Sequence, residues 1–462
     1  MLCQNCQKRE AVFHHKRILG GEVRETHLCA DCAAVLGLTD FFPGFSFPEV
    51  TREKELSSMT HTLRCETCGI TYDDILRAGL PGCPDCYRSF SEKLSPYVTR
   101  LHGRATYKGE PFPEIGAPVV PEKRWYEGDG PQADVVLGTR VRLGFNLRGV
   151  PYPVRLNVAQ KSRLSAELTR ILSGAGERFR LTEMADLYPY EAVSLAERFL
   201  ITPDFAGAGA GAALLLSEDL NLSVMLGLED HVRTESLAGG LDPFAAYTRA
   251  VRLRTFLHQN PGLAFDSRLG FLNQNPMEIG TGMRVEAILH LPSLAKTENL
   301  PALAATFRKL GFALTGAFGD GLSVKGDVYR LTNTLTMGLS EKESMENLRA
   351  VCMQLATLER RRAESYVEDV QVKDRIRRSE ALLRSASLLS SDELLDLLSW
   401  VRLGARYGLS EIPLPVLGDL TVNYFPATVN SVARGRLSSV DRDALRAKLV
   451  QKKLTEENAP TA

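Results

Sequence analysis

Cys65-Glu-Thr-Cys68, followed by Cys83-Pro-Asp-Cys86, decides the fold of the N-terminal part of this chain. Each C-x-x-C pair can present two thiolates to one metal ion, and the 14 residues between the pairs leave room for a hairpin or a short helix. A similar quartet precedes it, formed by Cys3, Cys6, Cys29 and Cys32. The pattern predicts two structural Zn²⁺ sites within residues 1–100, each supplying on the order of 10 kcal/mol of folding free energy.

The composition is typical of a globular protein, and its formal net charge is zero. Of its 462 residues 44% are apolar, and 56 basic side chains balance 56 acidic ones. Nucleic-acid binding is therefore unlikely, because no overall positive charge would attract a polyanion. The sequence shows no signal-peptide pattern and no membrane-length apolar run, so we expect a cytoplasmic protein without membrane contact. In that reducing compartment paired cysteines favour metal over disulfides, and Cys352, on an apolar helical stripe, is expected in the core.

The remainder of the chain reads as a linker followed by a large mixed body. Residues 101–130 are rich in Pro and Gly and predict a linker or a strapped-down connector. Helical and β-rich patterns alternate from there to about residue 335. Capping boxes at Ser340–Glu343 and Ser390–Glu393 predict the starts of two long amphipathic helices, and helix dominates the last hundred residues.

Four short segments of the body carry side chains suited to phosphate chemistry. They are Thr139-Arg-Val-Arg142, Glu229-Asp-His-Val-Arg233, Gly280-Thr-Gly-Met-Arg284 and Gly316-Ala-Phe-Gly-Asp-Gly321. On a strand, Arg140 and Arg142 point to the same face, where two guanidinium groups could clamp a polyphosphate. Each segment alone is a weak signal, because an arginine near a carboxylate is usually a solvated ion pair.

Taken in order, these segments and His290-Leu-Pro resemble the guanidino phosphotransferases, most closely the McsB family of protein-arginine kinases. The first ninety residues resemble McsA, the zinc-binding activator of that family, so the chain looks like a fusion of the two. The resemblance implies an α+β guanidino-kinase fold with an antiparallel sheet flanked by helices. The expected parts are a double zinc module (1–100), the linker, a small helical lobe (131–205), a catalytic α+β lobe (206–365) and a helical C-terminal region (366–462).

The resemblance also implies roles for individual residues. Arginines would hold ATP, accompanied by Mg²⁺, while carboxylates would orient the target guanidinium and take its proton as it attacks the γ-phosphoryl group. Motif by motif, the nucleotide-binding residues would be Arg140, Arg142, Arg233 and Arg284, and the catalytic residues Glu229, Asp230, Asp320 and Asn275. An Arg-Asp-x-x-Arg-Ala motif with Arg442, Asp443 and Arg446 matches the phosphoarginine-binding motif of the family.

Several positions depart from the family pattern, and they cluster in the site. Asn275 stands where the family has a cysteine, and Thr315 where it has a further phosphate-binding arginine. Leu228, Asp320 and Phe199 replace an acidic residue, a glutamate and a nucleotide-contacting histidine. Loss of one positioned catalytic group costs roughly 10² to 10⁴ in rate, so these changes leave two interpretations open.

The first interpretation is an active protein-arginine kinase in protein quality control and stress response, whose zinc module acts in cis. The second is a weakened or inactive pseudokinase that binds phosphoarginine proteins as an adaptor for a protease system. Expected partners are proteins bearing arginine or phosphoarginine and an AAA+ unfoldase-protease, and a homodimer is conceivable. A zinc-ribbon nucleic-acid binder is the third and weakest alternative, because of the neutral composition.

Overall fold

The computed structural model describes residues 13–19, 22–28, 63–103, 106–113, 123–127, 130–260, 262–297, 300–318 and 324–456. The first predicted Zn²⁺ site (Cys3, Cys6, Cys29 and Cys32) and the predicted catalytic Asp320 lie outside these ranges. Near the N-terminus, β1 (Phe13–Leu19) and β2 (Glu22–Leu28) pair as an antiparallel hairpin.

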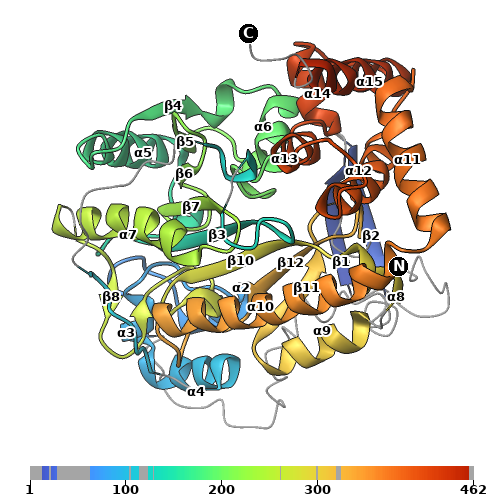
Figure 1. Cartoon of the computed structure of the whole chain (residues 1–462). Coiled ribbons are helices and arrows are strands. Elements are labelled where there is room, and N and C mark those ends of the chain that lie inside the picture. Colours follow the sequence, from blue (N-terminus) through green and yellow to red (C-terminus); the bar gives the residue numbers. More distant parts are fainter. Residues whose placement is uncertain are drawn as a thin grey trace.

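An eight-stranded antiparallel sheet forms the centre of the described body (Figure 1). Its strand order is β11-β12-β10-β3-β7-β6-β5-β4. The strands are β3 (Val136–Phe145), β4 (Phe179–Glu183), β5 (Ala213–Ser217), β6 (Leu222–Leu226), β7 (Val232–Gly239), β10 (Met283–His290), β11 (Phe312–Gly316) and β12 (Val328–Asn333). A separate two-stranded pair joins β8 (Phe265–Asp266) to β9 (Gly270–Phe271).

The two faces of this sheet differ because side chains alternate along each strand. On β3, Val141, Leu143 and Phe145 are fully buried in the main core, which α7 (Pro243–Gln259) and α10 (Glu341–Tyr366) help to form. The intervening Arg140 and Arg142 therefore point to the opposite face. Antiparallel pairing then places arginines and glutamates of β3, β7 and β10 side by side on that face.

Helices cover the sheet and build the C-terminal region. Besides α7 and α10, the described helices of the N-terminal part and the body are α2 (Tyr72–Ala78), α3 (Cys86–Ser89), α4 (Ser91–His102), α5 (Val158–Leu172), α6 (Pro189–Glu197), α8 (Pro292–Thr297) and α9 (Leu300–Lys309). The C-terminal region contains α11 (Val370–Ser385), α12 (Ser391–Arg406), α13 (Leu414–Val422), α14 (Pro426–Val432) and α15 (Ser439–Glu456). Short 3₁₀ turns are η1 (Trp125–Glu127), η2 (Pro153–Arg155), η3 (Met184–Asp186), η4 (Phe205–Gly207) and η5 (Pro276–Glu278).

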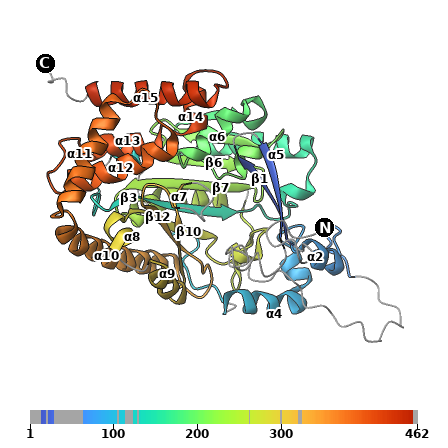
Figure 2. The same ribbon diagram turned by 90° about the vertical axis from the view of Figure 1, so that its right-hand side faces the viewer.

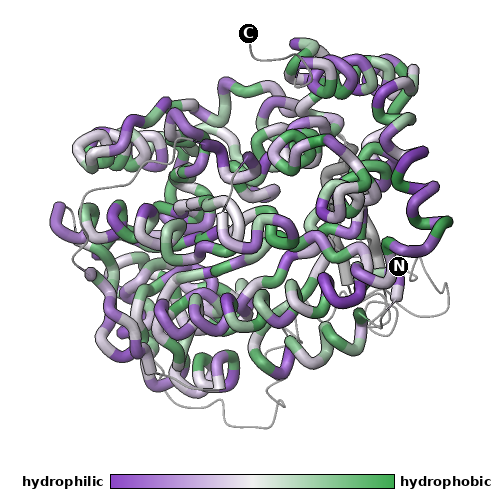
Figure 3. Tube along the Cα trace, in the orientation of Figure 1, coloured by the Kyte–Doolittle hydropathy of each residue, from purple (hydrophilic) through white to green (hydrophobic). Residues whose placement is uncertain are grey.

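The C-terminal helices pack around their own apolar core, as the predicted helical region requires. Figure 2 shows them in orange and red at the upper left, away from α2 and α4 at the lower right. Along α11, at the outer edge, hydrophilic and hydrophobic residues alternate (Figure 3), as expected of a helix with one buried face. In the described part of the chain, no helix combines the length and apolarity needed to cross a membrane.

Both predicted helix starts are confirmed. The Ser340 hydroxyl accepts a hydrogen bond from the Glu343 N–H at the start of α10, and Ser390 does the same for Glu393 at the start of α12. Each such cap contributes about 1 kcal/mol. Cys352 is fully buried in the main core, as its position on the apolar stripe of α10 predicts.

The predicted domain boundaries remain predictions, although their contents can be described. The range 131–205 contains α5 and α6, but also β3 and β4 of the shared sheet. Within the predicted linker, Trp125 is buried against the sheet, where its ring would collide with any side chain at Gly138. This part of the connector is therefore strapped onto the body.

Candidate active site and zinc centre

Four thiols of the N-terminal module meet at one point. The Sγ atoms of Cys65, Cys68, Cys83 and Cys86 all lie within 4.8 Å of one another. Three of the Sγ–Sγ distances are 3.5, 3.5 and 3.7 Å, close to the ~3.8 Å edge of a Zn²⁺ tetrahedron with bonds of ~2.3 Å. The donor set and geometry therefore fit the second predicted Zn²⁺ site.

The knuckles and helix caps around this centre follow from local sequence. The Cys65 N–H donates to the Ile70 carbonyl and the Gly69 N–H to the Cys65 carbonyl, which folds the first knuckle. Thr71 and Asp74 form a capping box that starts α2. Because the thiols are held on such short elements, metal binding and folding of this module are coupled.

The polar face of the sheet carries a network of arginines and glutamates. Arg140 donates through Nη1 to Glu235 and pairs through Nη2 with Glu286, both at 2.9 Å. Arg142 contacts the same Glu235 through Nε at 2.9 Å and Nη2 at 2.8 Å. The Arg140 side chain is only 7% exposed, and its guanidinium lies over the Phe199 ring, which covers it. Arg140 is thus fully engaged within the protein.

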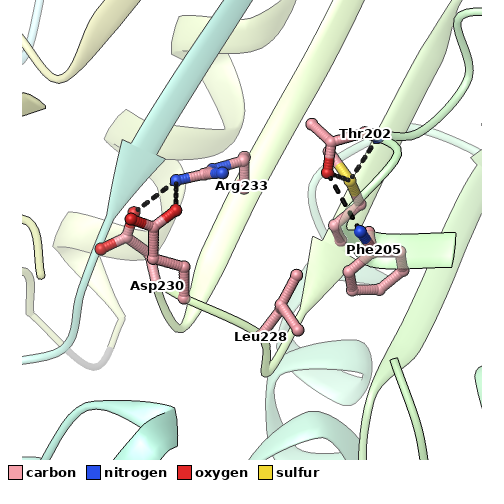
Figure 4. Close-up of a pocket in the computed structure, with 7 residues that line it drawn as sticks. Thr202, Phe205, Leu228, Asp230 and Arg233 are labelled. Atoms are coloured by element: carbon pink, nitrogen blue, oxygen red, sulfur yellow. Dashed lines mark hydrogen bonds and ion pairs between the residues drawn. The ribbon is translucent and has the colours of Figure 1, made fainter. Parts of the chain in front are cut away.

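Arg233 links this face to the predicted catalytic carboxylates. Its Nη2 contacts Glu229 at 2.6 Å, Glu278 at 3.1 Å and Asp230 at 3.2 Å. Figure 4 shows Asp230 turned toward Arg233, with Leu228 on the opposite side of the same turn. Burial alone would lower the pKa of Arg233, but the three carboxylates outweigh it and raise the pKa. Glu278 also contacts Arg284. Four of the predicted site residues, Glu229, Asp230, Arg233 and Arg284, therefore belong to one network of ion pairs.

Arg284 is held mainly by backbone oxygens. Its Nη1 donates to the carbonyls of Asn333 and Thr334, and its Nε lies 3.6 Å from Glu278. Burial lowers the pKa of Arg284, and Glu278 offsets this only in part. Gly280, at φ 101°, lets the preceding loop approach so closely that a side chain there would strike the Thr336 carbonyl.

Glu229 is the most exposed carboxylate of this group, with 30% of its side chain exposed against 14% for Glu278 and 0% for Asp230. Burial raises the pKa of Glu229, with Asp230 and Glu278 adding to the effect and Arg233 opposing it. A carboxylate with a raised pKa is a better proton acceptor than an ordinary surface glutamate. Its position and chemistry therefore suit the predicted role as base.

Asp230 acts as an anchor within the protein. Its Oδ1 accepts from the Asn146 amide at 2.7 Å and the Gln274 N–H at 3.0 Å, and its Oδ2 from Asn273 at 3.1 Å. His231 accepts from the Leu147 N–H, and its other ring nitrogen lies 2.7 Å from the Pro151 carbonyl. Both residues hold the turn that presents Glu229.

Asn275 lies on the loop that Asp230 anchors. Its side-chain oxygen accepts the Met277 N–H at 3.0 Å and caps η5. The amide therefore supports the loop that carries Glu278 between Arg233 and Arg284.

A small pocket lies beside Leu228, Asp230 and Arg233 (Figure 4). It is lined by Thr202, Phe205, Met225, Leu228, Glu229, Asp230 and Arg233, and its volume of about 10 Å³ leaves room for about one water. A triphosphate does not fit there. Arg233 and the other side chains that line this pocket would have to rearrange before a nucleotide binds in it.

The zinc module directly contacts the loop of residues 273–279 in the candidate site. The Tyr87 hydroxyl donates to the Asn273 carbonyl at 2.9 Å, and His102 Nε2 lies 2.8 Å from the Pro276 carbonyl. Around these bonds, Phe90 and Leu94 of the module share a buried cluster with Ile279 of the body. The second cysteine quartet is therefore coupled mechanically to residues 273–279.

The Arg-Asp-x-x-Arg-Ala motif lies on α15. Arg446 is fully buried and donates to the Tyr424 and Leu389 carbonyls at 2.7 Å, besides pairing with Asp443. Two buried donors, Arg442 Nε and Arg446 Nη2, have no hydrogen-bond partner among the described residues. Burial lowers the pKa of Arg446, and the like charge of Arg442 lowers it further.

Sequence reasoning missed the glutamates that balance the arginines. Glu235 and Glu286 stand two residues after Arg233 and Arg284, on the same strand faces. This is the i, i+2 signal that singled out Arg140 and Arg142, so the same test applied to acidic residues would have found them. Glu278 lies on a 3₁₀ turn, where no such periodicity could mark it.

The fold is that of an ATP:guanido phosphotransferase. Residues 161–362 match the family described as ATP:guanido phosphotransferase, C-terminal catalytic domain. Residues 63–109 match the McsA central zinc-finger domain, and residues 369–462 the protein-arginine kinase McsB C-terminal domain. The chain belongs to the protein-arginine kinase family, joined here to a McsA-type zinc module.

Curated relatives named protein-arginine kinase support this membership. The one from Moorella thermoacetica is 34% identical over 340 residues, which cover 72% of this chain and 97% of the relative. The one from Symbiobacterium thermophilum is 35% identical and also covers 72% and 97%. Among solved structures, the duplicated taurocyamine kinase from Schistosoma mansoni has a TM-score of 0.51 at 20% identity, covering 64% of this chain and 43% of that one. This likeness confirms the predicted fold class.

Proposed function

We propose that this protein transfers the γ-phosphoryl group of ATP to arginine side chains of proteins, in a quality-control or stress setting. The supporting observation is that Glu229 contacts Arg233, which Glu278 links to Arg284, on the polar face of the sheet. Arginines stay protonated and suit a polyphosphate, while Glu229 reaches solvent where a protein substrate could approach. Mg²⁺ would arrive with the nucleotide phosphates.

In the proposed reaction, a nitrogen of the target guanidinium forms a bond to the γ-phosphorus. The bond from that phosphorus to the bridging oxygen breaks, and ADP leaves with the electron pair. Glu229 accepts the proton that the attacking nitrogen loses, which its raised pKa favours. Asp230 keeps the turn rigid through its bonds to Asn146 and Asn273, so the carboxylate is oriented before substrate arrives.

The zinc module would act in cis on this site. Through Tyr87 and His102 it fixes the loop that includes Asn275 and Glu278. We propose that Zn²⁺ binding orders the module and, through these two bonds, the loop beside Arg233 and Arg284. Zn²⁺ binding would then strongly change the rate of phosphoryl transfer, while it would leave the fold of the central sheet largely unchanged.

The test is to incubate purified protein with ATP, Mg²⁺ and an arginine-rich protein and to search for acid-labile phosphoarginine by mass spectrometry. Glu229→Gln should abolish the product, while Glu177→Gln, in a buried ion pair with Arg249 elsewhere, should retain it. No product from the unsubstituted protein at high enzyme concentration would contradict the proposed kinase.

A pseudokinase adaptor is the second candidate, favoured by the state of Arg140. Both of its terminal nitrogens are already paired with Glu235 and Glu286, and Phe199 covers it. In that case the ligand would be phosphoarginine, bound at Arg442 and Arg446, and the protein would carry phosphorylated clients to an AAA+ unfoldase-protease. Measurable phosphoarginine binding without any kinase product would favour this candidate.

A further inference from the structure

Arg330 lies on the same face of the sheet as the proposed nucleotide-binding arginines. It sits on β12, directly opposite Ile288 of β10 and Thr315 of β11. On β10, Ile288 shares a face with Glu286 and Arg284, because residues two apart point the same way. Arg330 is therefore a fifth guanidinium on this face, and no motif of the sequence points to it.

Within the part of the chain that the structure describes, Arg330 differs from the other four arginines because it forms no ion pair with a carboxylate. Arg140, Arg142, Arg233 and Arg284 each lie within 4 Å of a glutamate. Among the described residues, the guanidinium of Arg330 makes one hydrogen bond, from Nε to the Gly316 carbonyl at 3.2 Å, and no ion pair.

The surroundings of Arg330 make this lack of a partner costly. Its side chain is half-buried, and burial lowers its pKa, an effect that the like charges of Arg140 and Arg142 reinforce and Glu286 opposes. The carboxylates nearest to it, Glu286 and Glu235, are already paired with Arg140 and Arg142, so the half-buried charge of Arg330 is only partly compensated in the free protein. A bound anion would remove that cost.

The residue opposite Arg330 on β11 leaves space beside its guanidinium. In an antiparallel pair, residues directly opposite have Cβ atoms about 5 Å apart and share one face. Thr315 is that neighbour, and it stands where the family resemblance leads one to expect an arginine. A guanidinium from Arg330 can reach the same space from the adjacent strand, with the short Thr315 side chain leaving room for it.

We propose that Arg330 binds a phosphate group of the nucleotide and replaces, from the neighbouring strand, the arginine missing at position 315. This inference rests on the proposed ATP-dependent function. It adds a binding residue that the family motifs do not contain, and it explains how the site could keep a full set of phosphate contacts.

The test is a calorimetric titration of the full-length protein with ATP and with adenosine. Arg330→Gln should weaken ATP binding about 10- to 100-fold, the value of one charge-assisted hydrogen bond, and leave adenosine binding unchanged. Arg377→Gln, an exposed arginine on α11, is the control and should bind as the unsubstituted protein does. The double variant Arg330→Gln/Thr315→Arg should recover most of the loss.

Each outcome separates the inference from the proposed function. Equal ATP affinity of Arg330→Gln and the unsubstituted protein would overturn the role of Arg330 while the kinase proposal stands. A loss that the double variant does not recover would overturn the cross-strand replacement. Absence of ATP binding by the unsubstituted protein would overturn both.

Discussion

Glu278 should weaken nucleotide binding, and Glu278→Gln should therefore strengthen it. The carboxylate contacts Arg233 at 3.1 Å and Arg284 at 3.6 Å, and so links two of the proposed nucleotide-binding arginines. A phosphate that binds these arginines must displace Glu278. Burial alone would raise the pKa of Glu278, but Arg233, Arg284 and Arg142 lower it, so it is ionised at neutral pH.

The size of the effect follows from the hydrogen bond between Glu278 and Arg233. One hydrogen bond to a charged group is worth about 1.5–3 kcal/mol, so freeing Arg233 from Glu278 should tighten ATP binding about 10- to 100-fold. Arg233 keeps Glu229 and Asp230 as partners. The loss of stability should therefore stay below the roughly 3–5 kcal/mol of a fully broken buried pair.

The assay is an ATP titration combined with denaturant unfolding of the same samples. Glu177→Gln is the matched control. Glu177 forms a buried ion pair with Arg249, at an N–O distance of 2.9 Å, and contacts none of the proposed nucleotide-binding arginines. This variant should lose stability without any gain in ATP affinity. If Glu278→Gln folds normally and binds ATP no more tightly than the unsubstituted protein, the carboxylate does not compete with phosphate and the reasoning is refuted.

Three further outcomes are expected. Glu229→Gln should raise the melting temperature at neutral pH. The pKa of Glu229 is raised in the folded protein, so its negative charge lowers the stability of the fold at pH values above this folded-state pKa. In acid, where Glu229 is protonated, the gain should vanish, as thermal scans at several pH values would show. Cys83→Ser, or zinc chelation, should lower phosphoarginine formation at least tenfold while circular dichroism retains most of the β signal, and unchanged turnover would contradict the cis role. Arg442→Ala should remove phosphoarginine binding with a stability change within about 0.5 kcal/mol, whereas Arg446→Ala should unfold more easily because its guanidinium ties α15 to two carbonyls; equal binding by both variants and the unsubstituted protein would exclude this site.

Local patterns in the sequence predicted those elements whose structure is decided locally. Ser340 and Ser390 start their helices as expected, because a hydroxyl cap acts on backbone groups three residues away. The alternation around Arg140 correctly placed it with Arg142 on one face of a strand. The spacing of the second cysteine quartet was enough to predict that its four thiols lie together, as the structure shows.

Partners across strands could not be predicted in this way. Glu235 and Arg142 meet because of a register set by the packing of the whole sheet, and no local signal specifies that register. The same holds for Arg330 and Thr315. Likewise, the contact of Tyr87 with Asn273 joins residues 186 apart, and only the folded chain shows it.

Covalent union of the zinc module with the body changes what kind of control is available. Tyr87 and His102 reach the loop at residues 273–279 from the same polypeptide, so their local concentration is fixed by the connector at roughly the millimolar level that short tethers give. Dilution or competition by another protein could hardly remove them. Under the proposed cis role of the zinc module, the supply of metal, and not the abundance of a second subunit, would set the active fraction of this protein.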